Sequence, residues 1–317
     1  MDRGVRVGAA ASATELATTW RPGRPVPLRS ILGTVGRGPG DRTMAVTDGV
    51  LWRGQQTPMG PATVALESRP AAGEVHARAW GPGAEWALTW LPASMGGLDD
   101  PTGFEVPPSL AHVYRLHPHW RVPRTGLVFE ALVAAALEQR VTGKEAWLGW
   151  RLLVRRYGDA APGPAGDRGL RVLPSAAVVR AIPSWEWLRM QVDGARSRVV
   201  VRAAVRHEAL QRTLTMHPGD ADQALQSLPG VGVWTSAEVR QRAHGHSDAV
   251  SFGDYHVPAS VGIALVGEPV DDEEMERLLE PYRPHRYRVQ RLVELGRIRR
   301  ERHGPRMAPR RHLPGSA

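Results

Sequence analysis

Cysteine is absent from the 317-residue sequence, and lysine is nearly absent. Without cysteine the chain cannot form a disulfide, a thiolate zinc site, a cysteine nucleophile or a cysteine-ligated iron–sulfur cluster. Lys144 is the only lysine, and arginine supplies the rest of the fixed positive charge. A lysine amine for covalent catalysis can therefore come from one position only.

Long apolar runs are also missing. No stretch approaches the roughly 20 apolar residues that a membrane-spanning helix needs, and the first residues do not have the pattern of a signal peptide. These features predict a soluble cytoplasmic protein with no membrane partner. The chain is long enough for two or more compact units, each with its own core.

The chain has an excess of positive charge, with a formal net charge of +9 and a pI near 10.9. The segment 297–317 contains seven arginines and one glutamate, so it carries +6 of that charge. We expect this basic tail to be disordered. The charge favours an anionic partner, although basic tails are often simply solvated.

The N-terminal third predicts a small α+β domain. Residues 1–19 are small and polar, and we expect them to be disordered. Within 20–107, short β-like runs are separated by glycine and proline, and a helix is predicted at 28–35. Alternation in the runs 43–47, 62–66 and 74–80 predicts an antiparallel sheet with one solvent-facing side.

From residue 108 to 296 the pattern predicts an all-α domain. Thr125 is expected to cap a buried helix over 127–139. Thr142 and Glu145 form a capping-box pattern for a helix that ends at Gly158, and 160–169 reads as a linker. Further helices are predicted at 175–182, 184–191, 195–214, 258–266, 271–282 and 285–295.

One stretch in this domain predicts two helices joined by a tight turn. A short helix is expected over 220–226 with Asp220 as its N-cap, and a second over 233–242. The loop Leu228-Pro229-Gly230-Val231-Gly232 lies between them. Its glycines permit positive φ and close approach of another backbone. The free amides of Val233, Trp234 and Thr235 would then form an anion site that suits a phosphate.

Gly-x-Gly alone is typical of any helix–helix turn. The longer string from Leu228 to Thr235, followed by Gly253-Asp254-Tyr255-His256, resembles the helix-hairpin-helix DNA glycosylases, which have a Gly/Pro-rich loop and a catalytic aspartate. The bacterial 3-methyladenine DNA glycosylase II type is the most similar subgroup. The resemblance covers about 20–296. It implies an α+β N-terminal lobe followed by an all-α helix-hairpin-helix glycosylase core, and the lack of cysteine excludes the branch with a four-cysteine cluster.

Asp254 matches the catalytic position of this family. A carboxylate there would stabilise the oxocarbenium-like transition state of N-glycosidic bond hydrolysis and orient the attacking water. The alternative is a simple N-cap, and both roles are compatible. Asp248 is a weaker candidate because it matches a structural position.

The family's bifunctional members have a lysine two residues after the second glycine, where it forms a Schiff base. Trp234 occupies that position here. The resemblance therefore implies a monofunctional glycosylase that uses water as the nucleophile.

The resemblance also implies the DNA contacts. The amides of the hairpin, at Gly230, Gly232, Val233, Trp234 and Thr235, would bind backbone phosphate. The segment 135–142 resembles the one that fills the gap left by a flipped nucleotide, and the wedge position falls on Arg140. The family has an apolar residue there, and Glu138 replaces a glycine or glutamine. An exposed arginine at a helix corner is the alternative.

The base-pocket match is partial. Trp234 matches a pocket aromatic, and Tyr255 is a neighbouring candidate. Glu238 and His285 stand where the family has aromatic residues, so the lesion stays open among alkylated, deaminated and oxidised purines. His244 and His246 invite a metal interpretation, but without a third ligand we interpret them as exposed loop histidines. No metal site or cofactor is expected, apart from a monovalent cation on backbone carbonyls near Leu228 and Val231.

The sequence thus predicts a monomeric bacterial enzyme of the cytoplasm, associated with the nucleoid. It would flip a damaged, alkylated purine out of double-stranded DNA and leave an abasic site. Two alternatives stay open: a non-catalytic helix-hairpin-helix DNA-binding protein, and an oxidised-purine glycosylase with lyase activity.

Overall fold

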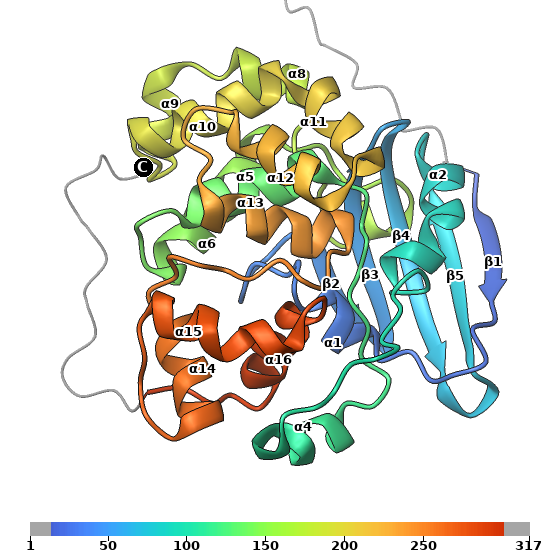
Figure 1. Cartoon of the computed structure of the whole chain (residues 1–317). Helices are drawn as coiled ribbons and strands as arrows, with labels where there is room; N and C mark the ends of the chain where they lie inside the picture. The colour runs from blue at the N-terminus through green and yellow to red at the C-terminus, as the bar shows by residue number, and fades with distance from the viewer. Residues whose placement is uncertain (1–13, 301–317) are drawn as a thin grey trace, which may run out of the picture.

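The computed structural model describes residues 14–300. A five-stranded antiparallel sheet comes first and a helical region follows it (Figure 1). The strand order is β1-β5-β4-β3-β2, so β2 to β5 form a meander and β1 pairs at its outer edge. The strands are β1 (Leu16–Trp20), β2 (Met44–Thr47), β3 (Val50–Thr57), β4 (Gly60–Arg69) and β5 (Glu74–Trp80). The expected α+β N-terminal region is confirmed.

Strand β1 corrects one expectation. Residues 16–19, which we expected to be disordered, pair with β5 in a register that places Leu16 opposite Ala79 and Trp20 opposite Val75. Two of these residues, Thr18 and Thr19, are polar, and most of the strand is exposed, as is usual at a sheet edge. Residues 1–13 and 301–317, including most of the predicted basic tail, lie outside the described residues.

The two faces of the sheet are covered differently. On one face α1 (Leu28–Leu32), α2 (Ala84–Thr89) and α3 (Leu91–Ser94) bury a core that includes Ile31 and Leu66. On the other face Trp52 stacks on Trp80, with ring centroids 5.6 Å apart. Residues 160–169, predicted as a linker, form α7 (Pro164–Asp167) and pack against this tryptophan pair.

The helical region forms two packed clusters (Figure 1). The first is built around the almost completely buried helix α5. Its helices are α5 (Val128–Glu138), α6 (Gly143–Tyr157), α8 (Ala176–Ala181), α9 (Ser184–Arg189), α10 (Gly194–Val205), α11 (His207–Arg212), α12 (Pro218–Gln226) and α13 (Val233–Val239). The predicted helix over 195–214 is therefore interrupted near Arg206.

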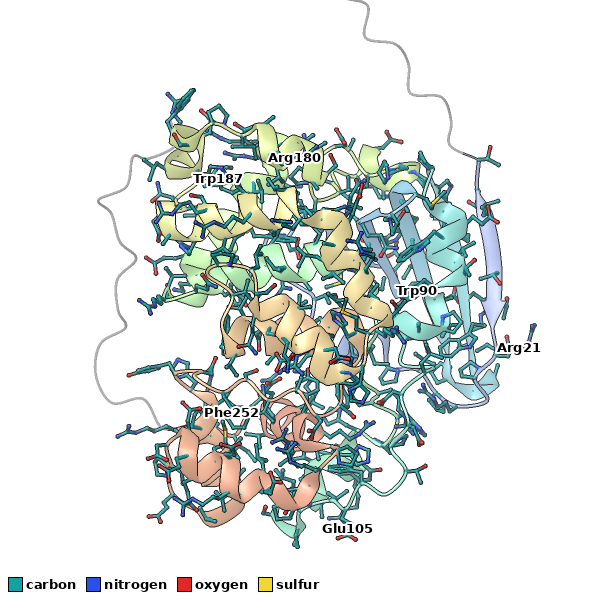
Figure 2. The ribbon with its side chains drawn as sticks, turned by 45° about the horizontal axis from the view of Figure 1, so that its top comes forward. Arg21, Trp90, Glu105, Arg180, Trp187 and Phe252 are labelled. Atoms are coloured by element: carbon teal, nitrogen blue, oxygen red, sulfur yellow. The ribbon has the colours of Figure 1, made fainter. Side chains whose placement is uncertain are left out.

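The second cluster combines three helices that follow the chain segment 245–256 with one helix that precedes α5. Its helices are α4 (Ala111–Leu116), α14 (Val257–Val266), α15 (Asp272–Leu279) and α16 (Arg286–Leu295). Tyr287 of α16 packs edge-on against Trp120 and joins the core of the sheet region. Phe252, labelled in Figure 2, lies two residues before Asp254 and packs against this cluster. Within residues 14–300, none of the helices combines the length and apolarity required to cross a bilayer.

Candidate functional site

Helices α12 and α13 form the predicted hairpin, which we call the α12–α13 hairpin, with its loop at 227–232. Its first helix begins earlier than expected. Pro218 occupies the first helical turn and the His217 side chain accepts from Gly219 N, so the prediction of Asp220 as the N-cap is wrong. Ser236 Oγ donates to Asp222 Oδ1 at 2.6 Å and fastens the two helices together.

The two loop glycines differ in what requires them. Gly230 has φ +95°, and a Cβ there would lie 2.5 Å from Val199 Cγ2. Gly232 has φ −104° and is the N-cap of α13, yet a Cβ there would meet no described atom within 4 Å. The packing of the chain explains Gly230 and leaves Gly232 facing open space.

The first amide groups of α13 follow Gly232 directly in the chain. The first hydrogen bond of the helix runs from Ser236 N to Gly232 O, so the amides of Val233, Trp234 and Thr235 precede it and have no acceptor within the helix. Val233 is half exposed, whereas the Thr235 side chain is buried. These three amides are the ones for which we predict a phosphate contact, and that contact stays a prediction.

The predicted wedge residue lies next to this loop. Gln139 Nε2 donates to Gly230 O and to Thr235 Oγ1, both at 2.9 Å. Arg140 follows it as an exposed residue with φ +55°, a conformation that is uncommon for a residue with a Cβ. The hydrogen bonds of Gln139 therefore hold Arg140 beside the hairpin.

Asp254 contacts both helical clusters. Its Oδ1 accepts from His256 N at 2.7 Å and Val257 N at 3.0 Å, which caps the start of α14. Its Oδ2 accepts from the indole Nε1 of Trp234 at 3.0 Å. Among the described residues, no ion pair neutralises this carboxylate. The structure thus joins the predicted catalytic residue to the predicted pocket tryptophan.

The chain segment that carries Asp254 is held by Glu238, which we expected at the base pocket, and by Gln290 and Asp272, which sequence reasoning missed. Ser251 Oγ donates to Glu238 Oε1 at 2.7 Å, and Gln290 Oε1 accepts from Ser251 N at 3.0 Å. Asp272 Oδ1 accepts from Gly253 N at 2.9 Å. These partners come from α13, α16 and α15. No local pattern in the sequence announces them.

Glu238 is buried next to Ser251 and forms an ion pair with Arg242 at 2.8 Å. Burial raises the pKa of the Glu238 carboxyl, while the neighbouring Arg242 acts in the opposite direction. Its carboxylate accepts from Ser251 and pairs with Arg242. They place Glu238 behind the segment that carries Asp254.

The other two predicted pocket residues lie in different surroundings. His285 is buried edge-on against Phe104, and its Nδ1 accepts from Arg288 while Nε2 pairs with Thr102 O. Tyr255 is 89% exposed. Trp234 is the one predicted pocket residue that the structure brings into contact with the Asp254 side chain.

His244 and His246 are not the exposed loop histidines that we expected. His244 is the last residue of η4 (Arg240–His244), a π-helical turn, and it is 4% exposed. The rings lie 5.1 Å apart, and His244 Nε2 pairs with Thr213 Oγ1 at 2.8 Å. Burial lowers the pKa of His244 to about 3 and that of His246 to about 4. In the part of the chain that the structure describes, no three His, Asp or Glu side chains are grouped to hold a metal ion.

Three carbonyls of the loop accept hydrogen bonds from the chain. Leu228 O accepts from Val231 N, Pro229 O from Arg202 and Gly230 O from Gln139. The monovalent cation on the carbonyls near Leu228 and Val231 stays a prediction.

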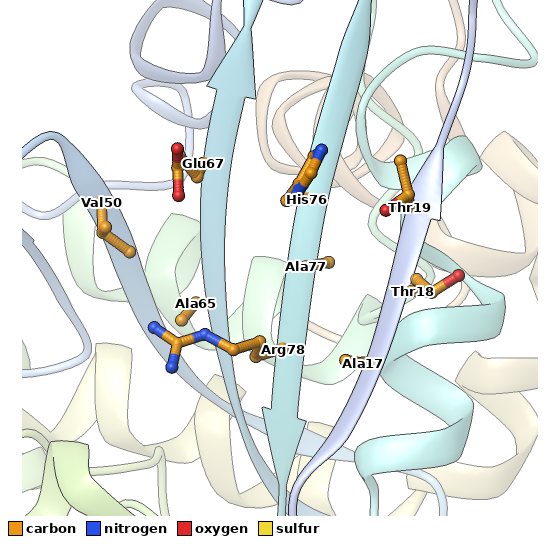
Figure 3. A pocket seen from close by; sticks show the side chains of 9 residues that line it. All are labelled: Ala17, Thr18, Thr19, Val50, Ala65, Glu67, His76, Ala77 and Arg78. Atoms are coloured by element: carbon orange, nitrogen blue, oxygen red, sulfur yellow. The ribbon is translucent and has the colours of Figure 1, made fainter.

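A hollow of about 450 Å³ lies on the sheet, over β5 and its neighbours (Figure 3). Thr19, Glu67, His76 and Arg78 line it. It contains none of the predicted site residues, so we do not assign it to the base.

Comparison with known proteins identifies the fold. Searches against protein-family models and against curated proteins found no match. Solved structures match over most of the chain. A 3-methyladenine DNA glycosylase from Archaeoglobus fulgidus has a TM-score of 0.70 at 18% identity, over 88% of this chain and 98% of its own.

Two DNA-bound structures are also similar. MBOgg1 with a low-affinity DNA ligand has a TM-score of 0.70 at 12% identity, over 92% of this chain and 97% of that one. An 8-oxoguanine glycosylase/lyase from Clostridium acetobutylicum bound to DNA has a TM-score of 0.66 at 10% identity, over 90% and 98%. These neighbours are DNA glycosylases of the helix-hairpin-helix class, and the chain shares their fold.

Proposed function

We propose that the protein is a monofunctional DNA glycosylase that flips a damaged, alkylated purine out of double-stranded DNA and hydrolyses its N-glycosidic bond. The product is an abasic site. One observation carries the proposal: in a fold shared with DNA glycosylases, the unneutralised Asp254 carboxylate is tied to Trp234 at the start of the α12–α13 hairpin's second helix.

The chemistry is that of a fixed carboxylate beside a developing positive charge. As the base departs, the deoxyribose acquires oxocarbenium character, and the Asp254 carboxylate stabilises it and orients the attacking water. Contacts from His256, Val257 and Trp234 hold the carboxylate before the substrate arrives, so it need not reorganise in the transition state.

DNA binding is assigned to the hairpin and the residue beside it. The amides of Val233, Trp234 and Thr235 bind a backbone phosphate without reading sequence. The open space at Gly232 lets that phosphate approach the backbone. Arg140 enters the stack where the nucleotide leaves, and its guanidinium plane stacks on the neighbouring bases.

The monofunctional assignment rests on the absence of a lysine at the hairpin position that forms the Schiff base in the bifunctional enzymes. Lys144 is the only lysine and lies exposed in the first turn of α6, inside the capping box of Thr142 and Glu145. Trp234 occupies the position of the Schiff-base lysine. Because glycosylase/lyases are among the structural neighbours, borohydride trapping on abasic DNA tests this assignment. A covalent adduct would contradict it.

Trp234 supports the proposal of an alkylated substrate. A purine alkylated on its ring carries positive charge, and the face of an indole attracts a cation. Trp234 is half-buried beside Asp254, where a flipped base would have to reach the carboxylate. We propose no cofactor, a monomeric enzyme, and a location in the bacterial cytoplasm at the nucleoid.

A second function is favoured by the two departures from the family pocket. Glu238 and His285 replace aromatic residues, and both are buried in contacts within the chain. These replacements fit a non-catalytic helix-hairpin-helix DNA-binding protein that has lost base excision.

Base release from duplexes that each contain one lesion separates the two functions. The wild type is compared with Asp254→Asn and with Asp48→Asn, a matched change in the exposed turn between β2 and β3. Excision by the wild type and Asp48→Asn, with loss in Asp254→Asn and retained DNA binding, supports the enzyme and names the lesion. If no protein releases a base while all bind DNA equally, the binding protein is the correct assignment.

A further inference from the structure

The solvent face of α10 carries only positive charge. From Asp193 to Glu208 the chain has no other acidic residue, but it has four arginines. Arg196 is the buried one: it pairs with Asp193 at 2.9 Å and donates to Leu137 O. The other three are Arg198, Arg202 and Arg206, and all three are exposed.

Helical spacing places these three side chains on one face. They recur every four residues, so successive side chains are neighbours along the helix surface. Val205, also exposed, lies between them. None of the three forms an ion pair with an acidic side chain within residues 14–300. We call this face, defined by Arg198, Arg202 and Arg206, the α10 arginine strip.

The strip reaches the loop of the α12–α13 hairpin. Arg202 Nη1 donates to Pro229 O at 3.1 Å, and Val199, on the preceding turn of α10, blocks the position that a Cβ on Gly230 would take. Gln139 and Arg140 contact or adjoin the same loop from the end of α5. Figure 1 shows α10 lying along α5, so exposed arginines flank the loop from two helices.

We propose that the α10 arginine strip binds backbone phosphates of duplex DNA beside the hairpin and extends the DNA contact away from the damaged nucleotide. The inference rests on the proposed function, because it takes DNA as the partner. Like charges at this spacing repel one another, so the face is not explained by helix stability. Guanidinium groups match phosphate geometry, and each phosphate neutralised releases condensed counterions and adds affinity.

The test uses two arginines that do not contact the hairpin. The variant Arg198→Gln/Arg206→Gln keeps the Arg202–Pro229 hydrogen bond. Its matched control, Arg29→Gln/Arg115→Gln, removes the same charge from exposed positions at α1 and α4. Fluorescence anisotropy measures the affinity of each protein for a duplex with a tetrahydrofuran abasic-site analogue and for an undamaged duplex, over a series of KCl concentrations.

We expect the slope of log K against log [KCl] to become shallower by about 0.9 per lost phosphate contact, thus by about 1.8 for the strip variant, on both duplexes. The control should keep the wild-type slope, and single-turnover base release at saturating enzyme should be unchanged in both. A strip variant with the wild-type slope, or a control with the same loss, would overturn the inference.

The same experiment separates this inference from the enzymatic one. A wild type that releases no base, combined with a reduced slope in the strip variant, leaves the strip assignment intact and removes the glycosylase assignment. If the wild type releases a base and the wild type and the strip variant have equal slopes, the glycosylase assignment stays and the strip assignment is removed.

Discussion

The two carboxylate oxygens of Asp254 have different partners. Oδ1 accepts from the first amides of α14, and Oδ2 accepts from the Trp234 indole. Because these partners come from two helical clusters, the plane of the carboxylate is set by how the clusters meet. The orientation of the Asp254 side chain therefore depends on how the two helical clusters pack against each other.

Replacing Trp234 by phenylalanine tests this orientation. The change keeps an aromatic face for a base and removes the donor to Oδ2. A hydrogen bond to a charged group contributes about 1.5–3 kcal/mol, so we expect base release to slow by about tenfold or more. Single-turnover kinetics measure it, with Trp185→Phe on the exposed face of α9 as the control. Equal rates for wild type and Trp234→Phe would show that the indole N–H does not orient the carboxylate.

The two loop glycines predict opposite effects of alanine. Gly230→Ala places a Cβ against Val199 in a left-handed conformation, so we expect a loss of about 1–3 kcal/mol in the free energy of unfolding. Gly232→Ala should change stability by less than about 0.5 kcal/mol and weaken DNA binding, because its Cβ fills the space left for phosphate. Urea unfolding and DNA titration measure the two quantities. Normal DNA binding by Gly232→Ala would contradict the phosphate assignment.

At the scale of helices and strands, the sequence predicted what depends on neighbouring residues. The capping box is an example: Thr142 N donates to Glu145 Oε2, Glu145 N donates to Thr142 Oγ1, and the helix ends at Gly158. The prediction of secondary structure failed where a contact with a distant part of the chain determines the conformation. Strand β1 forms because it pairs with the edge of β5. Strand β3 is buried along both faces, so its sequence does not alternate between apolar and polar side chains.

The π-helical turn η4 shows the same dependence on tertiary contacts. Regular helix was predicted through Arg242, but Arg240 pairs with Asp222 of α12 and His244 with Thr213. His246 packs against His244, and Arg124, Arg240, His217 and Asp222 are the charged or titratable groups that act on the two rings.

This turn predicts acid sensitivity. Both histidines have pKa values well below the usual 6.5 when folded, about 3 and about 4, so in acid the unfolded chain binds more protons than the folded chain. The free energy of unfolding should be fully present above about pH 6.5 and fall as pH drops from there toward 4. The loss is at most about 1.4 kcal/mol per pH unit for each histidine.

Denaturant unfolding between about pH 6.5 and about pH 4.5 checks this, since most carboxylates titrate lower. His244→Gln/His246→Gln should flatten the dependence, and the exposed His112→Gln should not. An unchanged pH dependence in the double variant would remove the histidine pair as its cause.

At the scale of the whole molecule, the sequence predicted the order of the sheet region and the helical region. It predicted less well which residues from distant parts of the chain come into contact. Trp234 and Asp254 were both predicted as site residues, because the motif that resembles the family contains them. Their support by Ser251, Gln290 and Asp272 was not predicted. Ser251 lies in a connecting segment, Gln290 in α16 and Asp272 in α15, and none has a local signature. The burial of His285 against Phe104 likewise depends on a segment far away in the chain.

The sheet and the first helical cluster meet through ion pairs that no local pattern reveals. Arg53 of β3 pairs with Glu130 of α5, with 5% and 11% of their side chains exposed. Arg37 pairs with Glu138, and Arg242 Nε donates to Thr34 O at 2.7 Å. Removing one partner of a buried pair leaves a charge without compensation, which typically costs about 3–5 kcal/mol.

Glu130→Gln should therefore lower the free energy of unfolding by about 3 kcal/mol, while Arg53→Met/Glu130→Leu recovers much of the loss because no charge stays buried. Glu274→Gln, which breaks the exposed pair with Arg277, should change stability by less than about 1 kcal/mol. Far-UV circular dichroism follows unfolding of the helices, and pulsed hydrogen exchange of the β3–β5 amides at each denaturant concentration follows unfolding of the sheet. Because the pair joins the two parts, we expect the two transitions to coincide in the wild type and to separate in Glu130→Gln. Coincident transitions with an unchanged midpoint in Glu130→Gln would mean that apolar contacts, rather than this pair, make the sheet and the helices one cooperative unit.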